Sequence, residues 1–178
     1  DDPILTQIRQ LPEIDIVTEC VEDQAMAIYE DKQAMVTIKG VEDNFDELTH
    51  ISEILYGDGQ FELHAANLQY GIIGIRLAQE LGTGTHFRGF MSIYAPQREG
   101  QLDLNDPTSG FVADSLMSPG VVFAVHQGKY DKGFIVTSIA FARNLFGQQG
   151  MLTSLELRIK EGNSLDAGKR KIQKIAGD

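Results

Sequence analysis

The order of the hydrophobic patterns along the chain limits its fold more than any other feature. Apolar residues recur at helical spacing in some of the 178 residues and alternate with polar residues in others. The patterns follow one another as helix, strands, helix, short strands, helix, and then strand and helix again. No internal repeat accompanies them, and strand–helix units do not recur at the regular interval that a parallel sheet requires. The sequence therefore predicts an α+β or mixed α/β domain.

Five segments have helical spacing and recognisable ends. The first opens with Asp2-Pro3, a capping side chain followed by proline in the first turn, and ends at Pro12. The second is expected to start after Asn44 as its N-cap and to continue to Leu55, before the glycines of Gly57-Asp58-Gly59. The other expected helices cover residues 75–81, residues 139–146 and the segment from Ser164 onward.

Strand patterns lie between these helices. Alternating or β-branched stretches predict strands at residues 14–21, 25–29, 34–38, 90–94, 121–126, 134–136 and 152–159. Residues 71–74 are expected to form a short apolar strand or a turn. The polar residues 30–33 separate the second and third of these strands and predict a hairpin turn.

The segment from Pro96 to Pro107 differs from the rest of the chain. It is polar, has no hydrophobic period and is bounded by two prolines, which predicts a long projecting loop or hairpin tip. Rigid scaffolds often carry binding residues on such loops. Two interpretations stay open, a variable surface loop or a tip that docks a partner. The candidate partner-binding residues are Pro96, Gln97, Arg98, Glu99, Gly100, Gln101, Leu102, Asp103, Leu104, Asn105, Asp106 and Pro107.

Charge is unevenly distributed along the chain. The net charge is −11, which argues against nucleic acid as the main partner. Residues 1–60 hold 15 acidic and 3 basic side chains, whereas residues 61–178 hold 11 acidic and 12 basic ones. The last segment is locally basic, either because it is a solvated helix face or because it approaches an anionic membrane surface. Its basic residues are Arg158, Lys160, Lys169, Arg170, Lys171 and Lys174.

The sequence holds no motif that binds a nucleotide or a metal ion. There is no Walker sequence, and Gly82-Thr83-Gly84 follows a helix and lacks a third glycine, so we interpret it as a helix end. The four histidines, at positions 50, 64, 86 and 126, have neither helical metal-site spacing nor a nearby cysteine. We therefore expect no catalytic residue, no metal and no cofactor.

Nucleophilic and acid–base candidates are equally weak. Cys20 is the only cysteine, which rules out an internal disulfide, and its neighbours Glu19 and Glu22 would raise the pKa of the thiol. No serine lies in a Gly-x-Ser-x-Gly pattern. Asp103 and Asp106 are interpreted as solvated loop charges rather than as a catalytic pair. An enzyme with a site dispersed over distant segments stays a less favoured alternative.

Membrane-spanning and leader segments are not expected in this chain. No apolar run approaches the roughly 18–20 residues that cross a bilayer. The chain opens with Asp1-Asp2-Pro3 rather than with a basic and then apolar stretch. We expect it to be an excised piece of a longer protein.

Several motifs in order resemble the periplasmic domain of lipoprotein-releasing (LolC/LolE-type) ABC permeases, and more broadly the MacB-like periplasmic core domain. They include residues 38–42 after a hairpin, residues 71–82 with their Gly-x-x-Gly and Leu-Ala elements, residues 90–96 ending in proline, residues 121–125, and residues 130–145 opening with Tyr130-Asp131. The chain departs from the family pattern at Ala124, where a glycine is usual, and at residues 86–89, which replace a Gly-Asp pair.

This resemblance implies a two-lobed α+β architecture. Residues 1–42 and 130–178 would form a Porter-like lobe, and residues 43–129 an inserted, β-rich Sabre-like lobe. Both chain ends would then lie together at the membrane. By strand order, Pro96–Pro107 falls where one permease of this family carries a hook that recruits the periplasmic lipoprotein chaperone.

The resemblance also implies a function. The domain would lie on the periplasmic side of the bacterial inner membrane, tethered by flanking transmembrane helices, and would couple cytoplasmic ATP hydrolysis to lipoprotein release. Its partners would be a second permease subunit, a cytoplasmic ABC ATPase, the lipoprotein substrate and a periplasmic chaperone. The alternative is a MacB-type efflux or peptide exporter that docks an adaptor protein. In either case the domain itself would not be an enzyme.

Overall fold

A 16-residue strand, β1 (Ile14–Tyr29), is the longest element of the computed structural model, which describes residues 2–98 and 103–177. Its hairpin partner is β2 (Lys32–Val41), and a two-residue turn containing Glu30 at a φ of 54° joins them. The sequence predicts two strands at 14–21 and 25–29, but the structure has one. The polar residues between the two stretches, Glu22 to Gln24, pair in register with Lys39 to Thr37 and so continue the ladder.

One mixed sheet is built around this hairpin. Its strand order is β3-β9-β6-β10-β2-β1-β7-β8, and β11 also pairs with β1. The pairs β10–β2 and β6–β9 are parallel, whereas the other pairs in this sheet are antiparallel. The remaining strands are β3 (Leu55–Gly57), β6 (Ile72–Gly74), β7 (Met91–Pro96), β8 (Phe111–Leu116), β9 (Val121–Phe123), β10 (Phe134–Ser138) and β11 (Ser154–Ile159). A separate small hairpin joins β4 (His64–Ala65) and β5 (Leu68–Gln69).

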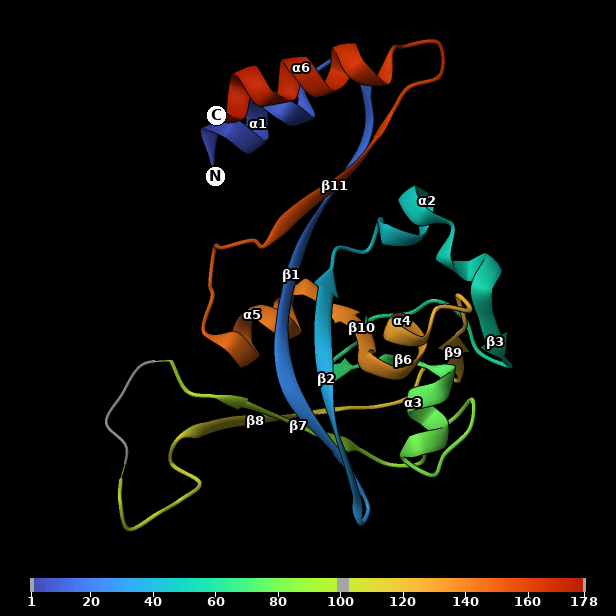
Figure 1. Cartoon of the computed structure of the whole chain (residues 1–178), viewed down its shortest axis with the longest axis vertical. Coiled ribbons are helices and arrows are strands. Elements are labelled where there is room, and N and C mark those ends of the chain that lie inside the picture. The colour runs from blue at the N-terminus through green and yellow to red at the C-terminus, as the bar shows by residue number, and fades with distance from the viewer. Residues whose placement is uncertain (1, 99–102, 178) are drawn as a thin grey trace.

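Two terminal helices close one end of the molecule. Helix α1 (Pro3–Arg9) begins as predicted, because the Asp2 carboxylate accepts a hydrogen bond from the Ile4 amide at 2.8 Å. Helix α6 (Leu165–Ala176) is capped by Ser164, as predicted. The two helices lie side by side above β11 and the first half of β1 (Figure 1). Their apolar faces share a cluster of Ile8, Leu11, Ile14, Val17, Leu155, Leu157, Ile159, Ile172 and Ile175.

The main core lies around the middle of the sheet. Helices α3 (Ile75–Glu80) and α5 (Ile139–Phe146) bury Leu77, Phe141 and Leu145 against Ile38 and Ile135 of the sheet. Both helices follow their predicted positions. A short helix that the sequence did not predict, α4 (Gly128–Gly133), precedes β10, and its buried Asp131 carboxylate accepts a hydrogen bond from the Val125 amide at 2.7 Å.

The helix predicted from Asn44 to Leu55 is broken in two. Helix α2 (Phe45–Thr49) ends at His50, which has a left-handed φ of 55°, and a 3₁₀ helix (Ile51–Ile54) follows. The Asp46 carboxylate accepts hydrogen bonds from the amide and hydroxyl of Ser52, at 2.8 and 2.6 Å, which stabilises the start of the second piece. Asn44 does not cap α2, because its amide group donates to the Val17 carbonyl at 2.9 Å.

An ion-pair network joins the end of α1 to the body of the molecule. The Arg9 guanidinium lies 3.1 Å from the Glu19 carboxylate and 3.2 Å from that of Glu42. Glu19 also pairs with Arg143 of α5 at 3.0 Å. Glu19 therefore links the terminal α1 to the helix that covers the central sheet.

The nine-stranded sheet joins strands from residues 1–42 and 130–178 with strands from residues 43–129. The division of the chain into Porter-like and Sabre-like lobes stays a prediction. Within residues 2–98 and 103–177, no helix has both the length and the apolar character needed to cross a membrane.

The contact between β2 and α5 leaves no room for a side chain at Gly40. A Cβ at this position would lie 2.4 Å from Cβ of Ala142 and 3.0 Å from Cα of Ile139. We expect Gly40→Ala to lower the free energy of unfolding by about 1–3 kcal/mol, the usual cost of overpacking. Urea denaturation of the whole chain would measure it.

Gly84→Ala is the matched control, because a Cβ at Gly84 meets no atom within 4 Å. Equal unfolding midpoints for Gly40→Ala and Gly84→Ala would contradict the tight β2–α5 contact.

Candidate functional site

The predicted loop at Pro96–Pro107 lies at the tip of a β-hairpin formed by β7 and β8. Figure 1 shows this hairpin extending away from the body, at the end of the molecule opposite α1 and α6. Its root is fixed in the core, because the inward-facing Met91, Ile93 and Ala95 of β7 and Leu116 of β8 are all completely buried. The tip is therefore presented by a rigid base.

Hydrogen bonds continue the hairpin beyond the strands. Pro96 pairs with Phe111 at the end of the ladder, and the Gln97 amide donates to the Gly110 carbonyl at 2.7 Å. The Arg98 guanidinium forms an ion pair with the Asp23 carboxylate of β1. The first arm of the tip is thus attached to the central strand of the sheet.

The second half of the tip consists of two successive turns. The Asp103 carboxylate accepts a hydrogen bond from the Asn105 amide at 2.9 Å. The Asp106 carboxylate accepts from the amide and the hydroxyl of Thr108, at 2.9 and 2.7 Å. The Ser109 hydroxyl connects the turns, since it accepts from the Asp103 amide at 3.0 Å and donates to the Asp106 carbonyl at 2.8 Å.

These turns give the two aspartates a structural role. The hydroxyl of Thr108, and then its amide, lower the pKa of the Asp106 carboxyl group by hydrogen bonding to its charged form. Asp103 and Asp106 were interpreted from the sequence as solvated charges, and both are exposed. Each carboxylate also orders the backbone two residues further on, as Asp does in Asx turns.

The tip also exposes apolar side chains. Leu104 is 94% exposed, and Phe111, opposite Pro96, is 52% exposed. Aromatic residues such as phenylalanine are enriched in the buried centres of protein–protein contacts. Of the predicted residues, the structure describes Pro96 to Arg98 and Asp103 to Pro107, whereas Glu99, Gly100, Gln101 and Leu102 lie outside the described residues.

Phe111 was missed in the sequence, together with the strand that begins there. The stretch from Phe111 to Leu116 is mostly exposed and includes Ala113 and Asp114, so it lacks a clear alternating pattern. The second proline, Pro107, also suggested that the loop ended earlier. The sequence did contain a signal for this strand. The turn residues Thr108, Ser109 and Gly110 are followed directly by the apolar, β-forming pair Phe111-Val112.

A second concave surface lies on the body of the molecule, between α2 and α4. It encloses about 370 Å³, and the break at His50 forms part of its rim. Its walls are mainly apolar and aromatic, with the rings of Tyr130 and Phe134 packed at a centroid distance of 5.0 Å. The lining residues are Lys39, Phe45, Thr49, His50, Ile51, Glu53, Ile54, Phe123, Val125, Gln127, Tyr130, Phe134 and Val136.

The described residues do not assemble a metal centre. No group of three or more His, Cys, Asp or Glu side chains in this part of the chain is placed to hold an ion. His64 pairs with Asp43 at 3.0 Å on the surface, and His50 and His126 occupy left-handed backbone positions. This arrangement offers no ligand set for a metal.

Cys20 lies completely buried in β1, between β11 and β2. Burial raises the pKa of its thiol to about 12, and the nearby carboxylates of Glu156 and Glu22 add to the increase. The sequence assigned this effect to Glu19 and Glu22, but desolvation is the larger cause. A thiol with this pKa holds almost no thiolate at neutral pH and is a poor nucleophile.

We expect the folded chain to resist thiol reagents. At pH 7.5, modification of Cys20 by an aromatic disulfide reagent should be at least 100-fold slower than in 6 M guanidinium, because burial removes both access and thiolate. The rate of chromophore release measures this difference. Equal rates for the folded and the unfolded chain would contradict the burial of Cys20.

The comparisons with known proteins agree with this geometry. No protein-family model matches the sequence, and no curated protein matches it. Among solved structures, the extracellular domain of the noncanonic ABC-type transporter YknZ from Gram-positive bacteria superposes with a TM-score of 0.64 at 11% identity, covering 99% of this chain and 83% of that one.

Two further structures are similar. The periplasmic region of MacB from Actinobacillus actinomycetemcomitans has a TM-score of 0.63 at 7% identity and covers 97% of this chain and 71% of its own. A domain of a putative permease protein from Porphyromonas gingivalis has a TM-score of 0.51 at 17% identity, with coverages of 99% and 69%. The likeness at these identities is one of fold. The predicted MacB-like α+β fold is therefore confirmed, and the chain has the fold of these extracytoplasmic transporter domains.

Proposed function

We propose that this chain is the extracytoplasmic domain of an ABC transporter permease, lying on the periplasmic side of the inner membrane. Its fold supports this assignment, since YknZ and MacB share it along almost the whole chain. The ATPase belongs to a separate subunit or domain on the cytoplasmic side. The domain binds a partner protein and couples ATP hydrolysis to transport, but it does not itself catalyse a reaction.

The observation that carries the proposal is a projecting hairpin with a buried root. The described residues of the hairpin tip, 97–98 and 103–110, extend from the end of the sheet opposite the terminal helices (Figure 1). Arg98 attaches the tip to β1, which continues to α1 at the other end of the molecule. A movement imposed on the terminal helices is thus transmitted to the tip through one strand.

The tip docks a soluble periplasmic partner, with Leu104 and Phe111 as apolar anchors. In a lipoprotein-releasing permease that partner is the lipoprotein chaperone, to which the cargo is handed over. The apolar cavity between α2 and α4 offers a surface for an apolar part of the cargo. The resemblance of the ordered sequence motifs to that family supports this finer assignment.

A MacB-type exporter domain that docks an adaptor protein is the second candidate. It is favoured by the TM-scores of 0.64 and 0.63 with YknZ and MacB. The complete gene distinguishes the two candidates. An ATPase encoded in the same chain supports the exporter, whereas a permease with a separate ATPase supports lipoprotein release.

Partner binding by the tip is tested with Leu104→Ser. We expect this variant to retain less than about one tenth of the affinity for the chaperone or adaptor of the same organism, because a buried apolar anchor contributes 1–2 kcal/mol or more. Pull-down and titration calorimetry with the purified partner would measure the loss. Met151→Ser is the control, since Met151 is an exposed apolar loop residue outside the hairpin.

A shortened hairpin provides the second test. An Asn-Gly turn replacing residues 98–109 would keep the Gln97–Gly110 pair and the root, and should abolish partner binding. If this folded variant bound the chaperone and the adaptor as well as the original chain does, the tip would not be the docking site.

A further inference from the structure

The outer face of α6 is strongly basic. The helix buries Gly168 and partly buries Ala167, Ile172 and Ile175, and these residues face α1 and β11. Helical spacing places Lys169, Arg170, Gln173 and Lys174 on the opposite side, and all four side chains are exposed. We call these four residues the α6 basic face.

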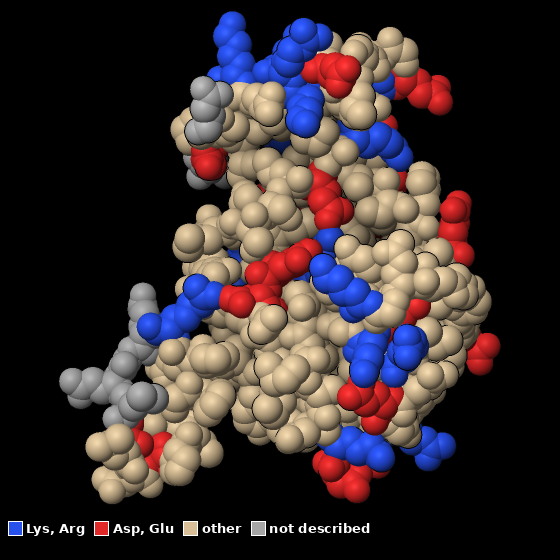
Figure 2. All heavy atoms as spheres, in the orientation of Figure 1, with Lys and Arg blue, Asp and Glu red and all other residues tan. Residues whose placement is uncertain are grey.

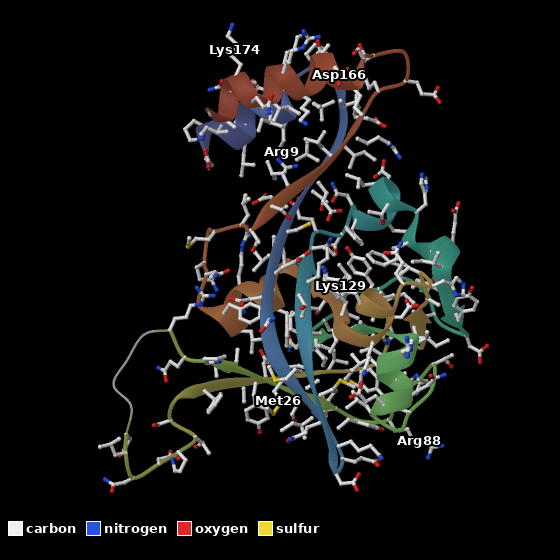
Figure 3. The ribbon with its side chains drawn as sticks, viewed as in Figure 1. Arg9, Met26, Arg88, Lys129, Asp166 and Lys174 are labelled. Carbon is white, nitrogen blue, oxygen red and sulfur yellow. The ribbon has the colours of Figure 1, made fainter. Side chains whose placement is uncertain are left out.

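In the described part of the chain, most charges of this face form no ion pair. Lys171, at the edge of the face, pairs with Glu13. Within residues 2–98 and 103–177, by contrast, Lys169, Arg170 and Lys174 form no ion pair. Asp166 lies in the first turn of α6, one turn before Lys169 and Arg170, and the Arg170 guanidinium donates to its backbone carbonyl at 3.3 Å. Figure 3 shows Asp166 at the opposite end of the helix from Lys174, so its charge offsets the basic face at that end only.

The α6 basic face lies at the end of the molecule that holds both chain ends. In Figure 1, α6 lies across one end of the long axis, beside α1, so that the two chain ends lie together. Figure 2 shows basic side chains gathered at this end, and Figure 3 shows Lys174 pointing away from the body while Arg9 points toward it. The basic face therefore forms the outermost surface of that end.

We propose that the α6 basic face binds the anionic headgroups of a phospholipid membrane. The orientation rests on the proposed function, in which this end carries the membrane tethers. Lys and Arg side chains near an anionic membrane gain favourable electrostatic energy, and the effect falls off within a Debye length. That length is about 8–10 Å at 0.1–0.15 M salt, so the acidic residues of the distant body are screened.

The shape and chemistry of the face favour a membrane over an acidic protein. A shallow hollow here is lined by Arg170, Gln173, Lys174 and Gly177, none of which carries a large apolar side chain. A stable protein interface has an apolar, closely packed centre, which these residues do not supply. Flexible cationic side chains over a flat helix face suit a layer of mobile headgroups.

The test uses vesicles of phosphatidylglycerol and phosphatidylcholine, with pure phosphatidylcholine vesicles as the uncharged reference. The whole chain should sediment with the anionic vesicles at about 0.1 M salt, where the acidic body is screened, and be released at about 0.5 M, where the basic face is screened as well. The triple variant Lys169→Gln, Arg170→Gln, Lys174→Gln should bind on the order of 100-fold more weakly, because each charge contributes roughly fivefold. Glutamine keeps helix propensity close to that of Lys and Arg.

The control variant is Lys32→Gln, Lys129→Gln, Lys132→Gln, which removes three exposed charges elsewhere and changes the net charge equally. It should bind within about twofold of the original chain. The proposal is overturned if the original chain ignores anionic vesicles, if the two triple variants bind equally, or if the face binds polyglutamate but not vesicles. None of these results bears on partner docking by the hairpin tip, so the proposed function is tested separately.

Discussion

Strand β1 is the element on which the rest of the structure depends. Its first half pairs with β11 from Ile14 to Cys20, and its second half pairs with β7 from Met26 to Ile28. The opposite edge pairs with β2 from Cys20 to Tyr29. Because strands that hydrogen-bond along both edges cannot shift register without exposing their buried faces, β1 fixes the terminal helices relative to the hairpin.

Ion pairs stabilise β1 near Cys20, where its pairing with β11 ends and before its pairing with β7 begins. The Glu19 carboxylate is 18% exposed and bridges Arg9 and Arg143, while Lys39 pairs with Glu22 at 3.3 Å and with Glu156. These partly buried pairs lie on both sides of Cys20. Loss of one partner in such a network leaves the other charge poorly solvated, so the network favours one arrangement of the strands. The proposed coupling function requires this kind of stiffness between the terminal helices and the hairpin tip.

The sequence predicted the elements whose signals are local. Asp2-Pro3 and Ser164 begin their helices as expected, and Gly82 and Gly147 follow helix ends with positive φ. The predictions were wrong where the local structure is determined by contacts with other segments of the chain. The break at His50 depends on Asp46 capping Ser52, and β8 exists because β7 offers it an edge to pair with. Helix α4 is only six residues long, with a glycine at each end, and leaves no periodic pattern.

The position of the candidate site could be predicted from the sequence, but the contacts that hold it in place could not. Two prolines and a polar run indicated a projecting tip, and the structure places it on a hairpin. Leu104 was among the residues predicted from the sequence, whereas the exposed Phe111 and the attachment of Arg98 to Asp23 depend on which strands pair, which the sequence did not reveal. Likewise, the sequence left two interpretations of the basic residues in the last segment, a solvated helix face or a membrane-facing one, and the position of α6 across the end that holds both termini favours the second.

The central claim is that this domain lies outside the cytoplasm, with its hairpin tip accessible from the periplasm. The full-length protein is used with any cysteine outside residues 1–178 replaced by serine. Because the native Cys20 is buried, Leu104→Cys then introduces one reactive thiol at the tip. The measurement is labelling by a membrane-impermeant maleimide in cells with a permeabilised outer membrane and an intact inner membrane. The account predicts labelling of the variant and none of the original protein. Labelling that required lysis of the inner membrane would contradict it.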